Sequence, residues 1–191
     1  MTEHPYSIDL DLKEVTAMVD AFVPYVYEDE LYGRVTMNLP RMTPGAVLLR
    51  LRRLNALRDR MSAAQLAALD SAAHHFEQAS TEWGVAYGKK LMQEAEARLR
   101  DIQIYVTECR DDPRLAANAY LPEALRRTMI QEVLLAMSDQ GEALKLKVRQ
   151  ADSGLRRHTQ PCPFLWDAVL QPIYPQDTYW WLYARPQPPT D

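Results

Sequence analysis

The sequence predicts an all-α protein: a bundle of long amphipathic antiparallel helices with a C-terminal wrap rich in proline and aromatic residues, and at most one or two very short strands. Apolar residues recur at spacings of three and four over long stretches, which places them on one face of a helix. Helix-start signals stand directly before two of these stretches. Prolines then interrupt every candidate for long regular structure in residues 161–189.

The composition is that of an ordinary folded protein, with 191 residues, 47% of them hydrophobic and 25% charged. A chain of this length buries about 70% of its unfolded surface in one core. We therefore expect one helical domain over residues 1–185 and a frayed tail at 186–191. The start lacks the segments of a secretory signal, and no apolar run approaches about 18 residues, so we expect a cytoplasmic protein with no membrane partner. Cys109 and Cys162 are expected to be reduced thiols.

The first predicted helix begins near Ser7 or Asp11 and presents one apolar face, formed by Val15, Met18, Val19, Phe22, Val23 and Val26. Pro24 lies inside this pattern, so we expect a kink or an early end there. Residues 34–39 alternate polar and apolar side chains, which indicates a short strand or an extended connector.

The next two helices have clear starts. Thr43-Pro44 supplies a capping hydroxyl and a proline at the first helical position, and this helix carries its apolar side chains as far as Met61. Ser62 and Gln65 form a capping box, so a further helix begins there.

The longest periodic pattern in the chain is a single apolar stripe of about 27 residues. Its members are Trp83, Tyr87, Leu91, Ala95, Leu99, Ile102, Val106 and Cys109. No proline interrupts residues 62–111, so a nearly continuous helical rod is predicted, weakened locally by two glycines and ended by Asp112-Pro113.

The C-terminal third is predicted to begin with a helix at Pro122 that stops near Gly141. Residues 144–149 alternate with a period of two yet also fit a helical turn or two, so both structures remain open. Residues 161–189 contain seven of the thirteen prolines and three of the four tryptophans. We expect a short helix at 164–170, followed by an aromatic wrap in which 179–184 is either strand or coil.

The charge is unevenly distributed. Residues 1–32 hold eight acidic residues and one lysine, whereas residues 41–60 hold six arginines and one aspartate. The arginines, Arg50 and Arg53 among them, are expected to pair within the chain or across a subunit interface. Binding to nucleic-acid phosphates through Arg50, Arg53, Arg58 and Arg60 is the less favoured alternative, because the strip has no aromatic side chain to stack on bases.

Three residues with the spacing of metal ligands lie in the helix predicted to begin at Ser62. Asp70, His74 and Glu77 fall on one helix face, with His75 and Glu82 nearby, and this spacing suits a transition metal. The set lacks the Glu-x-x-His pairs of a di-metal bundle, so a solvated polar face is preferred. We expect no cofactor.

Gly84 and Gly88 stand four residues apart beside Trp83 and Tyr87. Tight packing of another backbone against the glycines is the favoured interpretation. A ligand lying across this notch, lined by Trp83 and Tyr87 and by aromatics of the C-terminal segment, is the alternative.

The C-terminal aromatics are dense, and most of their rings are expected to cover the helical core. Any that stay exposed, with Trp180, Trp181 and Tyr183 as the candidates, would form an interface. The chain has no glycine-rich phosphate loop and no Gly-x-Ser-x-Gly. The leading hypothesis is a non-enzymatic module that binds itself or another protein. The alternatives are a small-molecule or metal-binding protein and a nucleic-acid-associated subunit.

Overall fold

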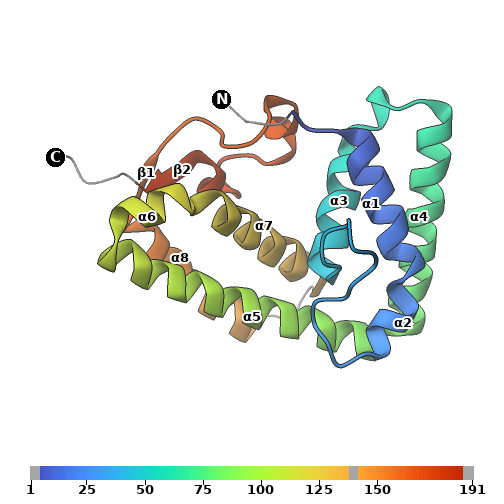
Figure 1. Cartoon of the computed structure of the whole chain (residues 1–191), viewed down its shortest axis with the longest axis horizontal. Coiled ribbons are helices and arrows are strands. Elements are labelled where there is room, and N and C mark those ends of the chain that lie inside the picture. Colours follow the sequence, from blue (N-terminus) through green and yellow to red (C-terminus); the bar gives the residue numbers. More distant parts are fainter. Residues whose placement is uncertain (1–4, 138–141, 187–191) are drawn as a thin grey trace. The chain divides into compact units, whose positions relative to one another are not determined.

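The computed structural model describes residues 5–137 and 142–186, and it confirms a mainly α-helical fold (Figure 1). The α-helices are α1 (Ile8–Asp20), α2 (Phe22–Tyr27), α3 (Pro44–Ala56), α4 (Ala63–Glu82), α5 (Gly84–Asp111), α6 (Pro113–Asn118), α7 (Tyr120–Met137) and α8 (Glu142–Arg156). Short 3-10 helices are η1 (Arg58–Arg60), η3 (Ala168–Ile173) and η4 (Trp180–Tyr183), and the described strands are β1 (Thr159–Pro161) and β2 (Ala184–Pro186).

Backbone contacts divide the chain into two compact units. The N-terminal unit comprises residues 7–94, and the C-terminal unit comprises residues 95–191 together with 1–6. Helix α5 begins in the first unit and ends in the second. A single domain over residues 1–185 stays a prediction, and residues 187–191 of the expected tail lie outside the described residues.

In the N-terminal unit, α1 packs against both α3 and α4, and α3 runs opposite to its two neighbours (Figure 1). Its core contains Val15 and Met18 of α1 and Phe22 of α2, which belong to the predicted apolar face and have no exposed surface. The first helix ends at Asp20 and α2 begins at Phe22, so the interruption expected near Pro24 is confirmed. Pro24 itself sits in the first turn of α2, where a missing amide costs no helical hydrogen bond.

The two predicted helix starts are confirmed. The Thr43 hydroxyl accepts a hydrogen bond from the amide of Ala46 at 3.2 Å. Ser62 and Gln65 make both hydrogen bonds of the capping box. Helix α3 ends at Ala56, before Met61, and η1 connects it to α4.

The connector between α2 and α3 has no strand in its described residues 34–39, and it is not extended either, because the Leu39 amide donates to the Thr36 carbonyl at 3.5 Å and closes a turn. A single antiparallel bridge joins Gly33 to Met42. A Cβ atom at Gly33 would lie 2.6 Å from Cδ2 of Tyr25, so glycine is required for the ring to pack this closely.

The predicted rod over residues 62–111 is wrong, because the helix is interrupted at Trp83 and its axis changes direction there (Figure 1). In a straight helix, Phe76 and Tyr87 would lie about 16 Å apart along the axis. Their ring centres are 5.8 Å apart, and both rings also contact Phe22. Aromatic packing that only a turn permits therefore competes with continuation of the helix.

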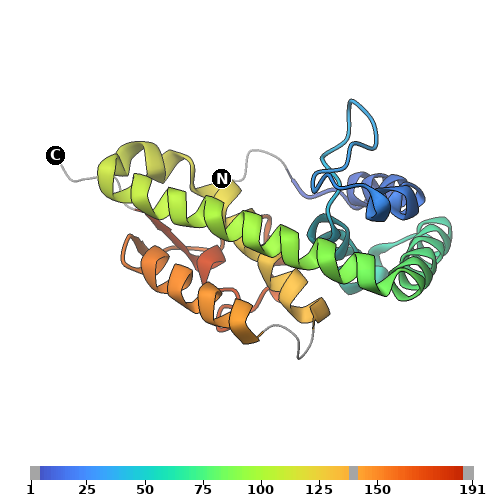
Figure 2. The ribbon, with the colours of Figure 1, turned by 90° about the horizontal axis from the view of Figure 1, so that it is seen from below.

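In the C-terminal unit, α7 runs back along its part of α5, and α8 runs antiparallel to α7 (Figure 2). Asp112 ends α5 as predicted and caps α6. Helix α7 starts at Tyr120, two residues before the predicted Pro122, and Gly141 lies outside the described residues. Residues 144–149 are helical, because α8 buries Leu144, Val148, Ala151 and Leu155 on one face.

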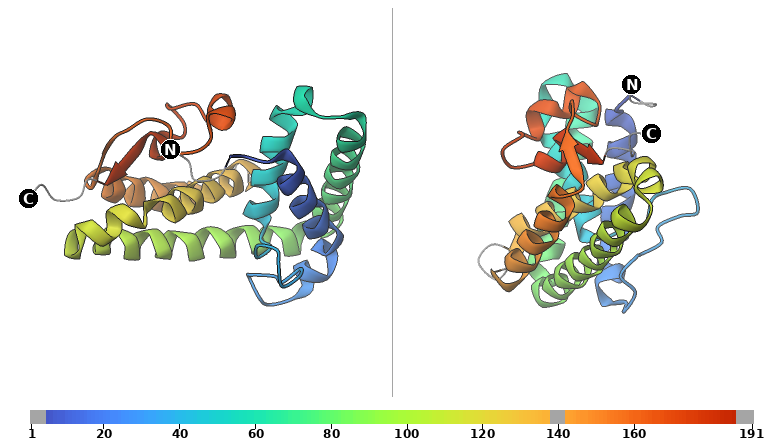
Figure 3. Two further views of the ribbon diagram at one scale, coloured as in Figure 1. Left: turned by 45° about the horizontal axis from the view of Figure 1, so that its top comes forward. Right: turned by 90° about the vertical axis from the view of Figure 1, so that its left-hand side faces the viewer.

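The segment after α8 crosses one face of α7 and α8 (Figure 3). Strands β1 and β2 form an antiparallel pair in which Pro161 faces Ala184 and Thr159 faces Pro186. The helix expected at 164–170 is displaced to η3, and residues 180–183 form η4. No helix in the described residues has the length and apolar character needed to cross a membrane.

Candidate binding pocket

Trp181 fixes the C-terminal segment to α7. Its side chain is 1% exposed, and its indole nitrogen donates to the Thr128 hydroxyl at 2.9 Å. The Tyr120 hydroxyl donates to the Trp181 carbonyl at 2.8 Å. The Arg127 guanidinium lies over the Trp181 ring and donates to both carboxylate oxygens of Asp152. Apolar burial and satisfied polar groups therefore hold this segment in one place.

A hollow of about 390 Å³ lies in the same segment. It is framed by two backbone hydrogen bonds of 2.9 Å, from Cys162 to Tyr183 and from Leu165 to Leu182. Its walls are formed by Cys162, Pro163, Phe164, Trp166, Ala168, Gln171, Gln176 and Tyr183. We call this hollow the aromatic pocket. Its volume is within the range of sites that hold small ligands or single side chains.

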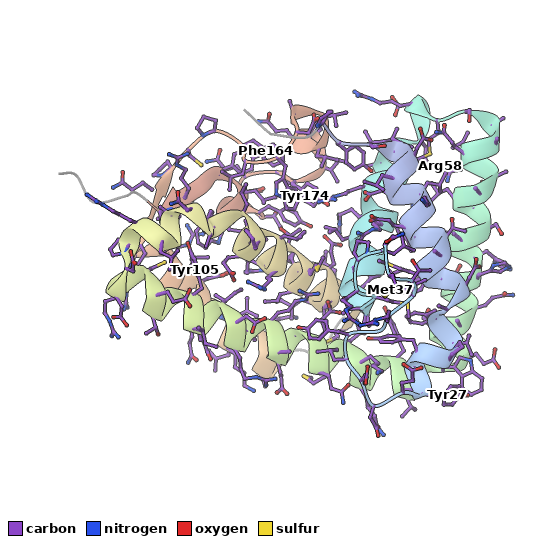
Figure 4. The ribbon with its side chains drawn as sticks, viewed as in Figure 1. Tyr27, Met37, Arg58, Tyr105, Phe164 and Tyr174 are labelled. Carbon is purple, nitrogen blue, oxygen red and sulfur yellow. The ribbon has the colours of Figure 1, made fainter. Side chains whose placement is uncertain are left out.

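The three rings of the aromatic pocket pack around Phe164. The centre of Phe164 lies 5.2 Å from that of Tyr183 and 6.3 Å from that of Trp166. Trp166 is perpendicular to Tyr174 behind it, at 5.2 Å and 87° (Phe164 and Tyr174 are labelled in Figure 4). The contacts of Trp166 are edge-to-face, whereas Phe164 and Tyr183 are tilted by 47°, and together these rings form the apolar walls of the pocket.

The polar groups of the pocket are uncharged. Two of the lining residues, Gln171 and Gln176, carry amide side chains, and none of the eight carries a charge. The Tyr183 hydroxyl donates to the Tyr174 carbonyl at 2.8 Å. Burial raises the pKa of Tyr183, and a hydrogen bond with Gln171 opposes that shift. An apolar ligand with carbonyl or amide groups would match these walls.

Cys162 adds a half-buried thiol to the pocket wall. Partial burial raises the pKa of Cys162, and the positive charge of Arg185 opposes the rise. The thiol therefore stays protonated at neutral pH and behaves as a small apolar group. Cys109 is also a free thiol, buried in α5.

Asp167 lies between two lining residues, Trp166 and Ala168, and is held by backbone amides. Its carboxylate accepts hydrogen bonds of 2.9 Å from the amides of Val169 and Tyr6. These two bonds lower the pKa of Asp167. The aspartate caps η3, the helix that carries Ala168 and Gln171.

The C-terminal aromatics proposed as an interface are mostly internal. Trp181 and Tyr183 are buried, whereas Trp180 is half-buried with the Arg156 guanidinium 3.8 Å from its ring centre. The expectation that these rings cover the helical core is confirmed for Trp181, which packs against Thr128 and Arg127 of α7. Of the three, Tyr183 lines the aromatic pocket.

Three of the four arginines proposed for nucleic-acid or subunit contacts, Arg50, Arg53 and Arg58, pair within the N-terminal unit. Arg50 donates to Glu14 at 2.8 Å and lies 3.7 Å from Asp11, and Arg53 lies 3.7 Å from Asp11. Arg58 donates to Asp70 at 2.7 Å. The intramolecular pairing predicted from the charge asymmetry is confirmed for Arg50 and Arg53.

The proposed metal ligands lie on the exposed side of α4. Asp70 is engaged by Arg58, and His74 and Glu77 are exposed. Across residues 5–137 and 142–186, no group of three or more His, Cys, Asp or Glu side chains is placed to hold a metal ion. The metal hypothesis gains no support from this arrangement.

The glycine notch is open. A Cβ atom at Gly84 or Gly88 would meet no heavy atom within 4 Å, so none of the described residues packs tightly against the glycines, and packing by another chain stays a prediction. The rings beside it face other partners in the N-terminal unit: Trp83 packs edge-on against Tyr27 at 4.8 Å, and Tyr87 packs against Phe22 and Phe76. A ligand over the notch stays a prediction.

Sequence reasoning missed Cys162, Phe164, Gln171 and Gln176 as parts of one site. The density of aromatics after residue 161 was the available signal, and it pointed to the correct segment. The hollow itself depends on how β1, η3 and η4 meet, which no local pattern encodes. In comparisons of this chain with protein-family models, with curated proteins and with solved structures, no match was found.

Proposed function

We propose that this protein is a protein-interaction module that holds a short uncharged segment of a partner protein in the aromatic pocket. The observation that carries the proposal is a hollow of about 390 Å³ lined by three aromatic rings and two amide side chains, without a charged lining residue. Aromatic rings supply large apolar contact, and the amide side chains can hydrogen-bond to the ligand backbone.

Two half-exposed rings in the pocket support binding over a purely structural role. Phe164 and Trp166 remain half-exposed in the pocket although neighbouring rings of the same segment are buried. A ligand that covers them gains apolar burial of about 25 cal/mol for each Å² and orders few additional side chains. Rigid aromatic anchors are the residues that dominate protein interfaces.

The test is selection of a random heptapeptide library on the full chain, with counter-selection on an Ala168→Phe variant. Ala168 is exposed and lines the pocket, so a phenyl group there fills the hollow without removing an existing contact. The matched control is Ala136→Phe, at an exposed position of α7 outside the lining residues.

The expected result is a set of uncharged peptides that bind the wild-type and Ala136→Phe proteins and lose at least about tenfold in affinity for Ala168→Phe. In an amide-correlation NMR spectrum they should shift the indole signal of Trp166, with the signal of Trp83 unchanged. Peptides that bind all three proteins equally would contradict the proposal. If native mass spectrometry shows a small molecule of defined mass bound to the wild type and absent from Ala168→Phe, the pocket is a small-molecule site and the proposal is contradicted.

A further inference from the structure

We propose that the N-terminal unit carries a second binding surface, where α4 meets α5, that holds an arginine side chain from a basic segment of a partner protein. Its central groups are the rings of Tyr27 and Trp83 and the carboxylate of Glu82, which we call the aromatic corner. The proposal does not rest on the use of the aromatic pocket, because these three residues belong to the other compact unit.

Tyr27 and Trp83 form a pair of rings at the surface. Tyr27 is the last residue of α2, and Trp83 stands between α4 and α5. Their ring centres lie 4.8 Å apart, with an angle of 63° between the planes. Tyr27 is 59% exposed and Trp83 is half-buried (Tyr27 is labelled in Figure 4). The pair therefore leaves aromatic surface in contact with solvent.

The surface beside these rings is open to a side chain from another molecule. A Cβ atom at Gly84, the residue after Trp83, would meet no heavy atom within 4 Å. Val85 is also exposed, as is Val23, which lies four positions before Tyr27 on α2. A partner segment laid across the rings can thus bury aliphatic surface as well. Such an open surface suits a side chain presented by a protein rather than an enclosed small molecule.

The carboxylate of Glu82 makes the aromatic corner negative. Glu82 is exposed, and no basic side chain pairs with it in the part of the chain that the structure describes. Partial desolvation raises the pKa of Tyr27, and the negative charge of Glu82 adds to the rise. The carboxylate therefore lies within electrostatic reach of the Tyr27 ring. Residues 71–88 contain no lysine or arginine.

The residues that follow Tyr27 add further negative charge. Glu28, Asp29 and Glu30 are exposed, and their charges act on Lys90. Lys90 is 3% exposed, and its ammonium group donates to the carbonyls of Glu28 and Glu30 at 2.7 and 2.6 Å. One buried ammonium thus faces three carboxylates, so this side of the unit keeps an excess of negative charge. A cationic partner complements it and an anionic one is repelled.

Arginine matches both the rings and the carboxylate. Its planar guanidinium stacks on aromatic faces and can give two parallel hydrogen bonds to one carboxylate. The C-terminal unit contains this arrangement within the chain, since Arg127 lies over the Trp181 ring and donates to both oxygens of Asp152. The aromatic corner presents the rings and the carboxylate of the same arrangement, and the partner supplies the guanidinium.

The experiment measures the fluorescence anisotropy of a labelled octapeptide of alternating arginine and glycine, titrated with the full chain. Salt at about 0.15 M screens long-range attraction to the acidic protein. The matched peptide carries citrulline, which has nearly the shape of arginine without its charge. We expect the arginine peptide to bind and the citrulline peptide to bind at least about tenfold more weakly.

Four variants at exposed positions identify the groups that bind the peptide. Tyr27→Leu removes a ring without changing the charge of the protein, whereas Tyr27→Phe keeps the ring. Glu82→Gln removes the carboxylate, and Glu108→Gln makes the same change on α5 in the C-terminal unit. Tyr27→Leu and Glu82→Gln should each weaken binding by about threefold or more. Tyr27→Phe and Glu108→Gln should bind as the wild type does.

Amide-correlation NMR locates the peptide independently of any variant. The indole signal of Trp83 should shift on addition of the arginine peptide, and that of Trp166 in the aromatic pocket should not. Absence of binding, or equal affinities for Tyr27→Leu and Tyr27→Phe, would overturn the proposal. A shift of Trp166 with Trp83 unchanged would overturn it too, because the peptide would then occupy the aromatic pocket.

Discussion

The guanidinium carbon of Arg127 lies 3.8 Å from the centre of the Trp181 ring, and the same guanidinium donates to the Asp152 carboxylate at 2.7 and 3.0 Å. One side chain of α7 thus joins α8 to the segment that carries the aromatic pocket. The Arg127 side chain is only 4% exposed, so its charge depends on Asp152 for compensation.

Replacement of Asp152 by alanine should destabilise the C-terminal unit by about 3 kcal/mol, because it leaves a buried guanidinium without its carboxylate. Urea unfolding followed by tryptophan fluorescence measures this in a Trp83→Phe background, where the remaining tryptophans are Trp166, Trp180 and Trp181. The matched control is Glu142→Ala, which breaks the exposed pair between Glu142 and Lys145 and should leave the midpoint unchanged. Equal urea midpoints for Asp152→Ala and Glu142→Ala would show that Asp152 does not compensate the buried charge of Arg127.

Gly45→Ala and Gly88→Ala should have opposite effects on stability. A Cβ atom at Gly45 would lie 2.7 Å from Oε1 of Glu94, a buried carboxylate that accepts hydrogen bonds from the Thr43 hydroxyl and the Gly45 amide. Displacing it should cost about 1–3 kcal/mol. At Gly88, inside α5, the added methyl meets open space and should stabilise the helix by about 0.5–1 kcal/mol. Thermal unfolding checks both, and a stabilised Gly45→Ala protein would show that Glu94 is not confined as described.

Glu123→Gln should stabilise the protein at neutral pH. Glu123 is 6% exposed, and its Oε2 atom is buried without a hydrogen-bond partner among the described residues. Burial raises the pKa of Glu123, although Arg126 opposes the shift. A carboxyl whose pKa is raised by folding binds more protons in the folded state, so its presence costs stability as the pH rises above the ordinary value of 4.5.

The urea midpoint of Glu123→Gln should therefore exceed that of the wild type at pH 7, and the difference should disappear as the pH falls below about 4.5. Glu108→Gln, at an exposed position of α5, provides the comparison and should track the wild type at both pH values. A wild type more stable than Glu123→Gln at pH 7 would mean that the Arg126 contact outweighs burial.

Cys162 should react with a disulfide reagent more slowly at pH 8 than a thiol in an unfolded peptide, because its raised pKa lowers the thiolate fraction. Arg185→Ala should slow it further at pH 8 and leave the limiting rate at high pH unchanged, since Arg185 acts through its charge. Cys109, 4% exposed, is the internal reference and should react only on unfolding. Absorbance of the released reagent gives both rates, and a pH-independent effect of Arg185→Ala would indicate a steric role instead.

The helical fold was predictable because its signals are local. Thr43-Pro44, the Ser62 and Gln65 capping box and the Asp112 cap each involve residues within one turn, and the structure places them as expected. The charge asymmetry correctly indicated internal pairing of Arg50 and Arg53, because two nearby segments of opposite charge are brought together by the packing of α1 on α3.

The errors concern interactions between residues distant in sequence. The turn at Trp83 depends on Phe22, Phe76 and Tyr87 meeting in one cluster, whereas the apolar stripe continues through it without interruption. The aromatic pocket likewise requires Cys162 beside Tyr183, 21 positions later, a proximity set by one backbone hydrogen bond. The spacing of apolar residues predicts which face of a helix is buried, but it does not predict contacts between residues distant in sequence.

Helix α5 gives the two compact units a shared stretch of backbone, with Leu91 buried in one unit and Leu99 and Ile102 in the other. Starting a helix is the costly step of its formation, and extending an existing one adds a hydrogen bond for each residue fixed. Whichever unit forms first therefore supplies a template from which the helix can grow into its neighbour. We therefore expect the unfolding of the two units to be coupled through the hydrogen bonds of α5, and a helix-breaking substitution near residue 94 to separate their melting transitions.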